Sequence, residues 1–168
     1  PGVGIPAIER FVSQHRDWAE RRAREFALLV PEAGQRRPAS VELAVLGQRW
    51  EVEYQRAKRG SFIDRGEGVL RVRTAESSDR QVSQALLRWL AGVAARELGA
   101  RLDERSAETG IGFSRMHLRR QRTRWGSCSA AGTISLNVCL MFQSPAVVRY
   151  LMVHELCHRV HMNHSKRY

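Results

Sequence analysis

The stretch H-E-L-C-H at residues 154–158, followed by His164, decides how this sequence is interpreted. Residues four apart on an α-helix lie roughly 40° apart around its axis, so His154 and His158 are expected to project from one face. Two imidazoles on one face can bind one metal ion. A catalytic zinc site takes three protein ligands and leaves one position open, and His164 is the candidate third ligand.

Glu155 lies beside the first histidine and is not needed as a ligand. Its carboxylate is expected to face the open position, where it takes a proton from water and returns it to a leaving group. This assigns Glu155 as the general acid and base of a hydrolase. Because H-E-x-x-H also occurs by chance, the surrounding sequence has to support the assignment.

The surrounding sequence predicts a buried helix. Ser144 is a typical N-cap, and Pro145 is a typical first helical residue. The apolar residues of this segment are Val147, Val148, Leu151, Met152, Val153, Leu156 and Val160. Unpaired ionisable side chains are costly in such a setting, and a metal ion explains them together. Asn163 tolerates a left-handed turn, so we expect the helix to end near 162–163 and His164 to fold back.

Three further segments accompany the motif, and they are Arg122-Thr123-Arg124-Trp125-Gly126-Ser127-Cys128, Ile134-Ser135-Leu136-Asn137 and Asn163-His164-Ser165. With residues 150–158, they resemble the signature of the YgjP-like metal-dependent hydrolases, which are similar to the SprT-like zinc metalloproteases. The resemblance implies an α+β, zincin-like fold, with a small antiparallel or mixed sheet, a long helix and an active-site helix. It also implies His154, His158 and His164 as zinc ligands and Glu155 as the catalytic residue.

Hydrophobic periodicity predicts the other elements. Amphipathic patterns indicate helices at 5–29 and 79–107, the second interrupted at Gly99, and a linker at 31–40. Turns are expected at 47–48, 59–68 and 126–132. The expected strands lie near residues 41–46, 49–57, 69–73, 111–124 and 133–138. The last two strands are expected to form an antiparallel pair before the motif helix.

The chain of 168 residues suits one domain with a core of its own. We expect residues 1–40 to form an N-terminal helix and linker, and residues 41–168 to form the metallohydrolase domain. Since the sequence starts at Pro1 and stops at Tyr168, both ends are expected to be truncated relative to family members. No apolar run is long enough to span a membrane, and no signal peptide is visible.

The cysteines Cys128, Cys139 and Cys157 are odd in number and lie within expected strands or helices. This placement predicts free thiols and a reducing, cytoplasmic location.

The net charge of +11 favours a polyanionic partner. Arginine supplies 26 of the 28 basic residues, so a bias in composition also explains the charge. Alternate residues of a strand share a face, which would align Arg120, Arg122 and Arg124 along one edge. These three are the candidate contacts for DNA, another polyanion or phosphate.

The substrate and its surroundings are predicted more coarsely. An edge strand beside the cleft is expected to hold a peptide by strand addition, and the resemblance points to residues 134–137 or 115–124 as that edge. Trp125 is expected in the core. His161 and Tyr168 are candidates for assisting at the oxyanion.

Three functions stay open on the sequence alone. The first is a zinc-dependent peptidase that acts on peptides or proteins, with Glu155 as acid and base. The second is a metal-dependent nucleotide phosphohydrolase, in which arginines near the cleft bind phosphates. The third is a nucleic-acid-binding module with a structural zinc, but a closed structural site has no use for Glu155.

Overall fold

The computed structural model describes residues 37–58, 61–66, 68–75, 78–121 and 123–160. The chain divides into two units, Pro1–Pro38 and Ala39–Tyr168, and the elements below belong to the second unit. Several predictions fall outside the described residues: the helix at 5–29, most of the linker, Arg122, His161, His164 and Tyr168.

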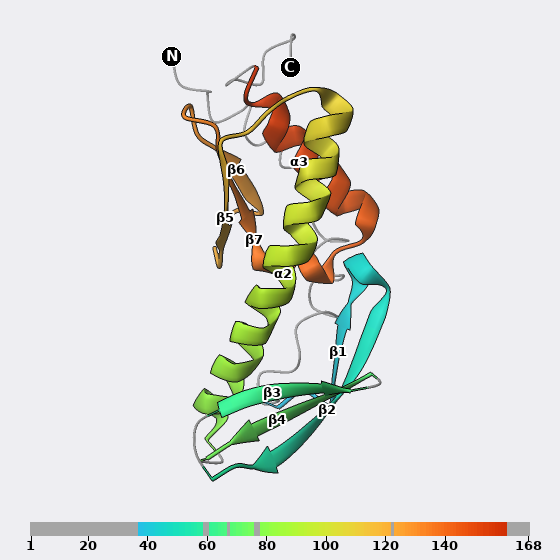
Figure 1. The fold of residues 1–168 in the computed structure, drawn as a ribbon, viewed down its shortest axis with the longest axis vertical. Coiled ribbons are helices and arrows are strands. Elements are labelled where there is room, and N and C mark those ends of the chain that lie inside the picture. Colours follow the sequence, from blue (N-terminus) through green and yellow to red (C-terminus); the bar gives the residue numbers. More distant parts are fainter. Residues whose placement is uncertain (1–36, 59–60, 67, 76–77, 122, 161–168) are drawn as a thin grey trace, which may run out of the picture. The chain divides into compact units, whose positions relative to one another are not determined.

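The first part of the described chain forms a sheet of four strands in the order β1-β2-β4-β3 (Figure 1). Its strands are β1 (Ser40–Leu43), β2 (Gln48–Arg56), β3 (Ser61–Gly66) and β4 (Val69–Thr74). β2 pairs with β4 in parallel, and the other two pairings are antiparallel. A short 3₁₀ helix, η1 (Ala44–Leu46), follows β1 where the strand was expected to continue.

The prediction of a turn over residues 59–68 is wrong, because β3 occupies most of that range. β3 pairs with β4 along its whole length, from Ser61 opposite Thr74 to Gly66 opposite Val69. The glycines on both sides of this segment suggested a long turn. This segment is a strand because it pairs with β4, and a local sequence pattern carries no information about that partner.

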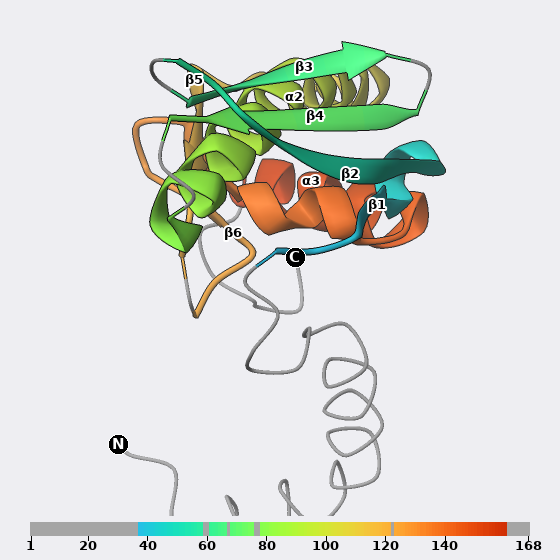
Figure 2. The ribbon, with the colours of Figure 1, turned by 90° about the horizontal axis from the view of Figure 1, so that it is seen from below.

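A continuous helix, α2 (Asp79–Thr109), connects the two parts of the unit. Ser78 caps its start by accepting a hydrogen bond from the Gln81 backbone N–H at 3.3 Å. The interruption expected at Gly99 does not occur. A Cβ atom there would lie 3.7 Å from the Met116 side chain, which is an ordinary contact distance, so the packing on β5 does not require a glycine. The N-terminal part of α2 packs on the first sheet, and its C-terminal part packs on α3 and β5 (Figures 1 and 2).

Within the described residues, a second sheet has three strands in the order β5-β7-β6. They are β5 (Arg115–Arg119), β6 (Gly126–Cys128) and β7 (Thr133–Asn137). β7 is parallel to β5 and antiparallel to β6. The predicted antiparallel pairing of 111–124 with 133–138 is therefore wrong. The intervening residues form an edge strand, β6, where a turn was expected, and β7 returns beside β5 in the same direction.

A 3₁₀ helix, η2 (Val138–Phe142), leads into α3 (Pro145–Cys157). The predicted start is confirmed, since the Ser144 hydroxyl accepts a hydrogen bond from the Val147 N–H at 3.4 Å. The predicted end near 162–163 is wrong, because α3 ends at Cys157. The chain then tightens into 3₁₀-type bonds, with the Arg159 N–H donating to the Leu156 carbonyl at 2.8 Å.

Two hydrophobic clusters fill the unit. The larger joins α2, β7, η2 and α3, and the smaller joins β2, β4 and the start of α2. α3 contributes Val148, Met152 and Leu156 to the larger cluster, but Val147 and Tyr150 are exposed, so only one face of this helix is buried. The α+β class is confirmed, with two sheets instead of the single sheet expected.

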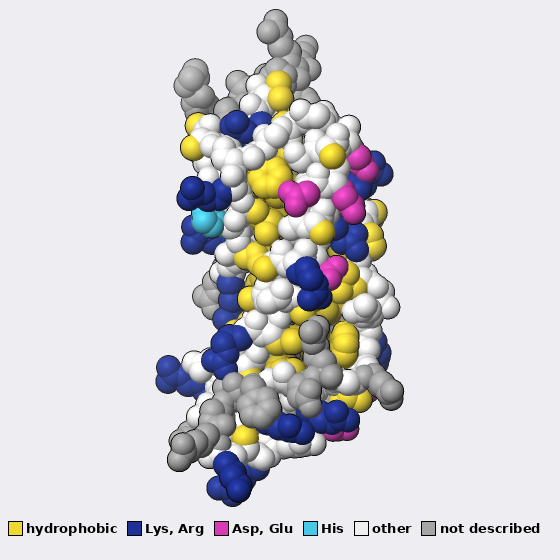
Figure 3. All heavy atoms as spheres, viewed as in Figure 1, with side chains coloured by type: hydrophobic (Ala, Val, Ile, Leu, Met, Phe, Trp, Pro, Cys, Tyr) yellow, Lys and Arg dark blue, Asp and Glu magenta, His cyan; other side chains and the backbone are white. Residues whose placement is uncertain are grey.

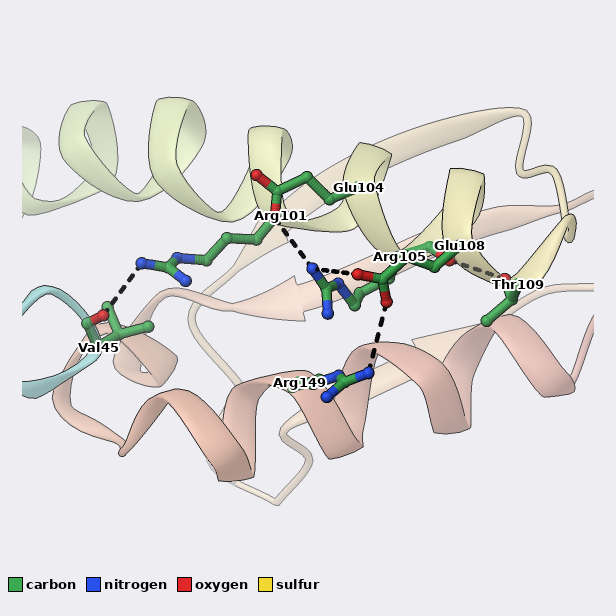
Figure 4. A network of polar contacts seen from close by, with 7 residues as sticks. All are labelled: Val45, Arg101, Glu104, Arg105, Glu108, Thr109 and Arg149. Atoms are coloured by element: carbon green, nitrogen blue, oxygen red, sulfur yellow. Dashed lines mark hydrogen bonds and ion pairs between the residues drawn. The ribbon is translucent and has the colours of Figure 1, made fainter.

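A network of polar contacts connects α3 to α2 (Figure 4). Arg105 pairs with Glu108 at 2.8 Å, and Glu108 pairs with Arg149 of α3 at 3.5 Å. Arg101 donates to the Val45 carbonyl in η1 at 3.1 Å. Among the described residues, no helix combines the length and the apolar character that crossing a membrane requires.

Candidate active site

A cleft of about 290 Å³ lies between β6 and the C-terminal end of α3. It is lined by Arg124, Gly126, Ser127, Cys128, His154, Glu155 and His158. The R-W-G-S-C segment and the H-E-x-x-H motif, which are separated in sequence, thus form its two walls. A larger groove of about 620 Å³ lies between α2 and α3 and contains none of these residues.

Two histidines lie at the end of α3. His154 belongs to the last turn, and His158 is the C-cap with helical dihedral angles, φ −63° and ψ −14°. Their ring centroids are 4.9 Å apart, with the ring planes at 88°. Two imidazoles this close fit the donor set that zinc prefers. The third predicted ligand, His164, is outside the described residues, and among those described no three metal-ligating side chains come together.

Glu155 is buried, with 4% of its surface exposed, and its carboxylate lies against the backbone of β6. A Cβ atom added to Gly126 would come within 2.6 Å of Glu155 Oε1. Any larger residue at 126 would therefore displace the carboxylate. Glu155 thus lies at one wall of the cleft, in space that Gly126 leaves open because it has no side chain.

Burial raises the pKa of the Glu155 carboxyl above its ordinary value, and the nearby His158 partly offsets this. None of the hydrogen bonds among the described residues involves this carboxylate, so burial is not compensated by a donor. A carboxylate with a raised pKa is better suited to accept and return a proton near neutral pH.

Asn137 positions the loop that forms the second wall. Its side-chain amide donates to the carbonyls of Gln121 at 2.7 Å and Arg124 at 2.9 Å, and its Oδ1 accepts from the Cys139 N–H at 3.0 Å. The side chain is buried, so these bonds form away from solvent. The sequence placed Asn137 in a motif but gave it no role. A polar residue ending an apolar strand was the available signal.

Arg159, directly after His158, ties the end of α3 to two loops. Its guanidinium donates to the carbonyls of Gly112 at 3.3 Å and Ala130 at 3.1 Å. Gly132 has φ +82°, and a Cβ atom there would lie 2.8 Å from the Arg159 guanidinium carbon. This contact was not predicted, and it fixes the position of the chain immediately beyond the second histidine.

Cys128 brings a thiol into the cleft. Burial raises its pKa, Arg159 lowers it, and Glu155 raises it further, with burial the largest effect. Cys128, Cys139 and Cys157 are all free, as predicted.

The predicted arrangement of Arg120, Arg122 and Arg124 on one strand edge is wrong, because β5 already ends at Arg119. Arg124 lines the cleft. Arg120 lies near the Cys139 thiol, where its charge partly offsets the increase in pKa caused by burial. Arg122 is outside the described residues.

A basic ridge lies instead on β5 itself. Arg115, His117 and Arg119 alternate along this strand and therefore share a face, while Met116 and Leu118 pack on the core. On the face drawn in Figure 3, basic side chains flank an imidazole over this strand.

Two further expectations are corrected. Trp125 is 36% exposed and does not belong to the core, because it lies in the loop before β6. Of the two expected edges, residues 134–137 lie in β7 at the centre of the sheet, whereas residues 115–119 form β5 at one edge of the described sheet. The strand edge that borders the cleft is β6.

Comparisons with known proteins identify the family of the chain. The model of the YgjP-like metallopeptidase domain matches residues 1–168. No curated protein and no solved structure matches the chain. The matched range includes both walls of the cleft, and the chain belongs to the YgjP-like family of metallopeptidase domains.

Proposed function

We propose that the chain is a zinc-dependent peptidase, with Glu155 as general acid and base and with His154, His158 and His164 as metal ligands. The family assignment supports a metal-dependent peptidase. The observation that carries the residue assignment is the packing of the Glu155 carboxylate against Gly126, in a cleft that also contains the two imidazoles.

Zinc held by His154, His158 and His164 would supply a Lewis acid that acidifies water and polarises a carbonyl. Glu155 accepts the proton of the attacking water and returns it to the leaving amine. Its burial beside β6 raises its pKa, which favours holding the proton between the two steps. Asn137 positions the loop before β6, and Arg159 ties the end of α3 to the loop after β6, which favours a fixed place for the carboxylate beside the imidazoles.

The peptide substrate is proposed to bind along the edge of β6. In the described part of the chain, β6 pairs with β7 on one side only, and its residues line the cleft. Its free backbone groups are suited to hydrogen-bond an extended chain by strand addition. A bound peptide would then lie across the end of α3, close to Glu155.

A nucleotide phosphohydrolase is the alternative that one observation favours. Arg124 lies in the cleft, and none of the ion pairs among the described residues involves it. Its guanidinium is suited to phosphate. The free thiols support a cytoplasmic location. The net charge of +11 and the basic ridge of Arg115, His117 and Arg119 support contact with DNA or another polyanion.

The test uses the purified full chain loaded with zinc, a mixture of fluorogenic peptides and a panel of nucleoside triphosphates. We expect peptide cleavage, with a loss of about 100-fold or more in Glu155→Gln at unchanged zinc content. His164→Ala should bind zinc more weakly. Loss of zinc together with activity in Glu155→Gln would make Glu155 a ligand, and hydrolysis of triphosphates without peptide cleavage would favour the alternative.

A further inference from the structure

Large apolar side chains are exposed at four places in the described part of the chain. They are Trp125 at 36%, Val147 at 41%, Tyr150 at 72% and Val160 at 61%. All four belong to the segments that form the cleft or continue directly from them. Single exposed apolar residues are ordinary, but a group beside a cleft is typical of a binding surface.

Tyr150 makes the connection to the cleft itself. It lies one turn before His154 on α3, and the two ring centroids are 6.0 Å apart with their planes at 33°. Val147, three residues before Tyr150, lies on the same side of the helix. The Tyr150 ring and the Val147 side chain therefore extend the surface of the His154 ring away from Glu155.

The core does not account for this exposed pair. α3 contacts the hydrophobic cluster through Val148, Met152 and Leu156, which lie on another face. Arg149, next to Tyr150, is directed toward Glu108 of α2, as Figure 4 shows. Tyr150 also borders the groove between α2 and α3, and its ring is 6.0 Å from the ring of His154, which lines the cleft.

We propose that Tyr150, together with Val147, determines specificity by forming a subsite for a large apolar side chain of the peptide substrate. The inference rests on the proposed peptidase function. Its occupant is an extended peptide on the edge of β6, because the exposed ring lies next to His154, which lines the cleft in which that peptide would lie. Side chains of an extended chain alternate, so one residue near the scissile bond faces α3 and contacts the Tyr150 ring.

The experiment compares fluorogenic peptides that differ at one position, with Phe, Leu or Ala on either side of the scissile bond. Mass spectrometry of the products locates that bond. The enzymes are the wild type, Tyr150→Phe, Tyr150→Ala and, as a control on another face of α3, Arg149→Ala. We expect Tyr150→Ala to lower the ratio of kcat/KM for the Phe over the Ala peptide about tenfold, mainly through KM. Tyr150→Phe and Arg149→Ala should keep the wild-type ratio.

Two kinetic outcomes would overturn the subsite. One is an unchanged Phe-to-Ala ratio in Tyr150→Ala. The other is an equal loss on all peptides that Tyr150→Phe reproduces, which would give the hydroxyl a part in the chemistry. Failure of the peptidase function is seen separately, as no cleavage by the wild type. Fluorescence anisotropy of the same peptides on the zinc-loaded protein then decides: a preference for the Phe peptide that Tyr150→Ala abolishes supports the subsite, and no preference overturns it.

Discussion

The two parts of the unit differ in where their ionisable and amide side chains lie. On the four-stranded sheet, Arg71 pairs with Glu53 at 3.2 Å and Arg49 pairs with Glu51 at 3.1 Å, in solvent-exposed positions. In the three-stranded sheet and α3, the polar side chains of Asn137 and Glu155 are each only 4% exposed. Exposed ion pairs contribute little to stability, whereas buried polar groups constrain everything that touches them. The first sheet therefore acts as a tolerant support, and the second fixes the geometry of the site.

The largest effect should come from a pair of matched glycine substitutions. Gly126→Ala places a Cβ atom 2.6 Å from Glu155 Oε1, while Gly66→Ala places one 3.3 Å from the flexible end of Arg71. We expect Gly126→Ala to lose about 100-fold in peptidase activity and about 1–3 kcal/mol in the free energy of unfolding. Gly66→Ala should change stability by less than about 0.5 kcal/mol. Urea denaturation and kcat/KM measure both variants.

If Gly126→Ala and Gly66→Ala had the same small effects on kcat/KM and on the free energy of unfolding, the assignment of Gly126 as the support of Glu155 would be contradicted. A loss of stability in Gly126→Ala without any loss of activity would also contradict it.

The next effect concerns a buried and an exposed polar side chain. Asn137→Ala removes two hydrogen bonds to carbonyls and the acceptor for the Cys139 N–H. We expect it to destabilise the protein by about 2–3 kcal/mol and to lower activity by displacing the loop that forms the second wall of the cleft. Arg71→Ala, which removes an exposed ion pair, should cost less than about 1 kcal/mol. If thermal unfolding ranks the two variants the other way, the contrast between the sheets fails.

The smallest effect is a gain in stability. Because burial raises the pKa of Glu155, the folded state retains a proton that the unfolded state releases at the same pH. The stabilising contribution of the protonated Glu155 carboxyl is fully present below the pKa that this group has in the unfolded state. It is lost as the pH rises through the pKa of the group in the folded state. Glu155→Gln carries no such dependence, so at neutral pH the metal-free variant should be more stable than the wild type by about 1 kcal/mol.

Thermal unfolding with a chelator, from acidic to neutral pH, measures this difference, with Glu53→Gln on the first sheet as the control. A gap between Glu155→Gln and the wild type that does not narrow toward low pH would show that burial of the charge is not its cause.

The sequence predicted elements whose signals are local. Ser144 and Pro145 defined the start of α3, and spacing placed His154, Glu155 and His158 in one cleft. β3 and β6 were missed because short strands flanked by glycines look like turns until their partners are known. The clamps by Asn137 and Arg159 connect residues far apart in the chain, so no local pattern contains them.

The length of α2 has a consequence for how the unit unfolds. At 31 residues it spans about 46 Å, and its side chains enter both hydrophobic clusters, Val82 and Ala85 in one and Leu98 and Leu102 in the other. Trp89 packs against both. Because one helix belongs to both hydrophobic clusters, the clusters are expected to unfold cooperatively. Unfolding of the middle of α2 would remove helical residues from both. Amide exchange along α2 is thus expected to follow a single global opening, and the supporting sheet and the cleft are expected to lose their structure together.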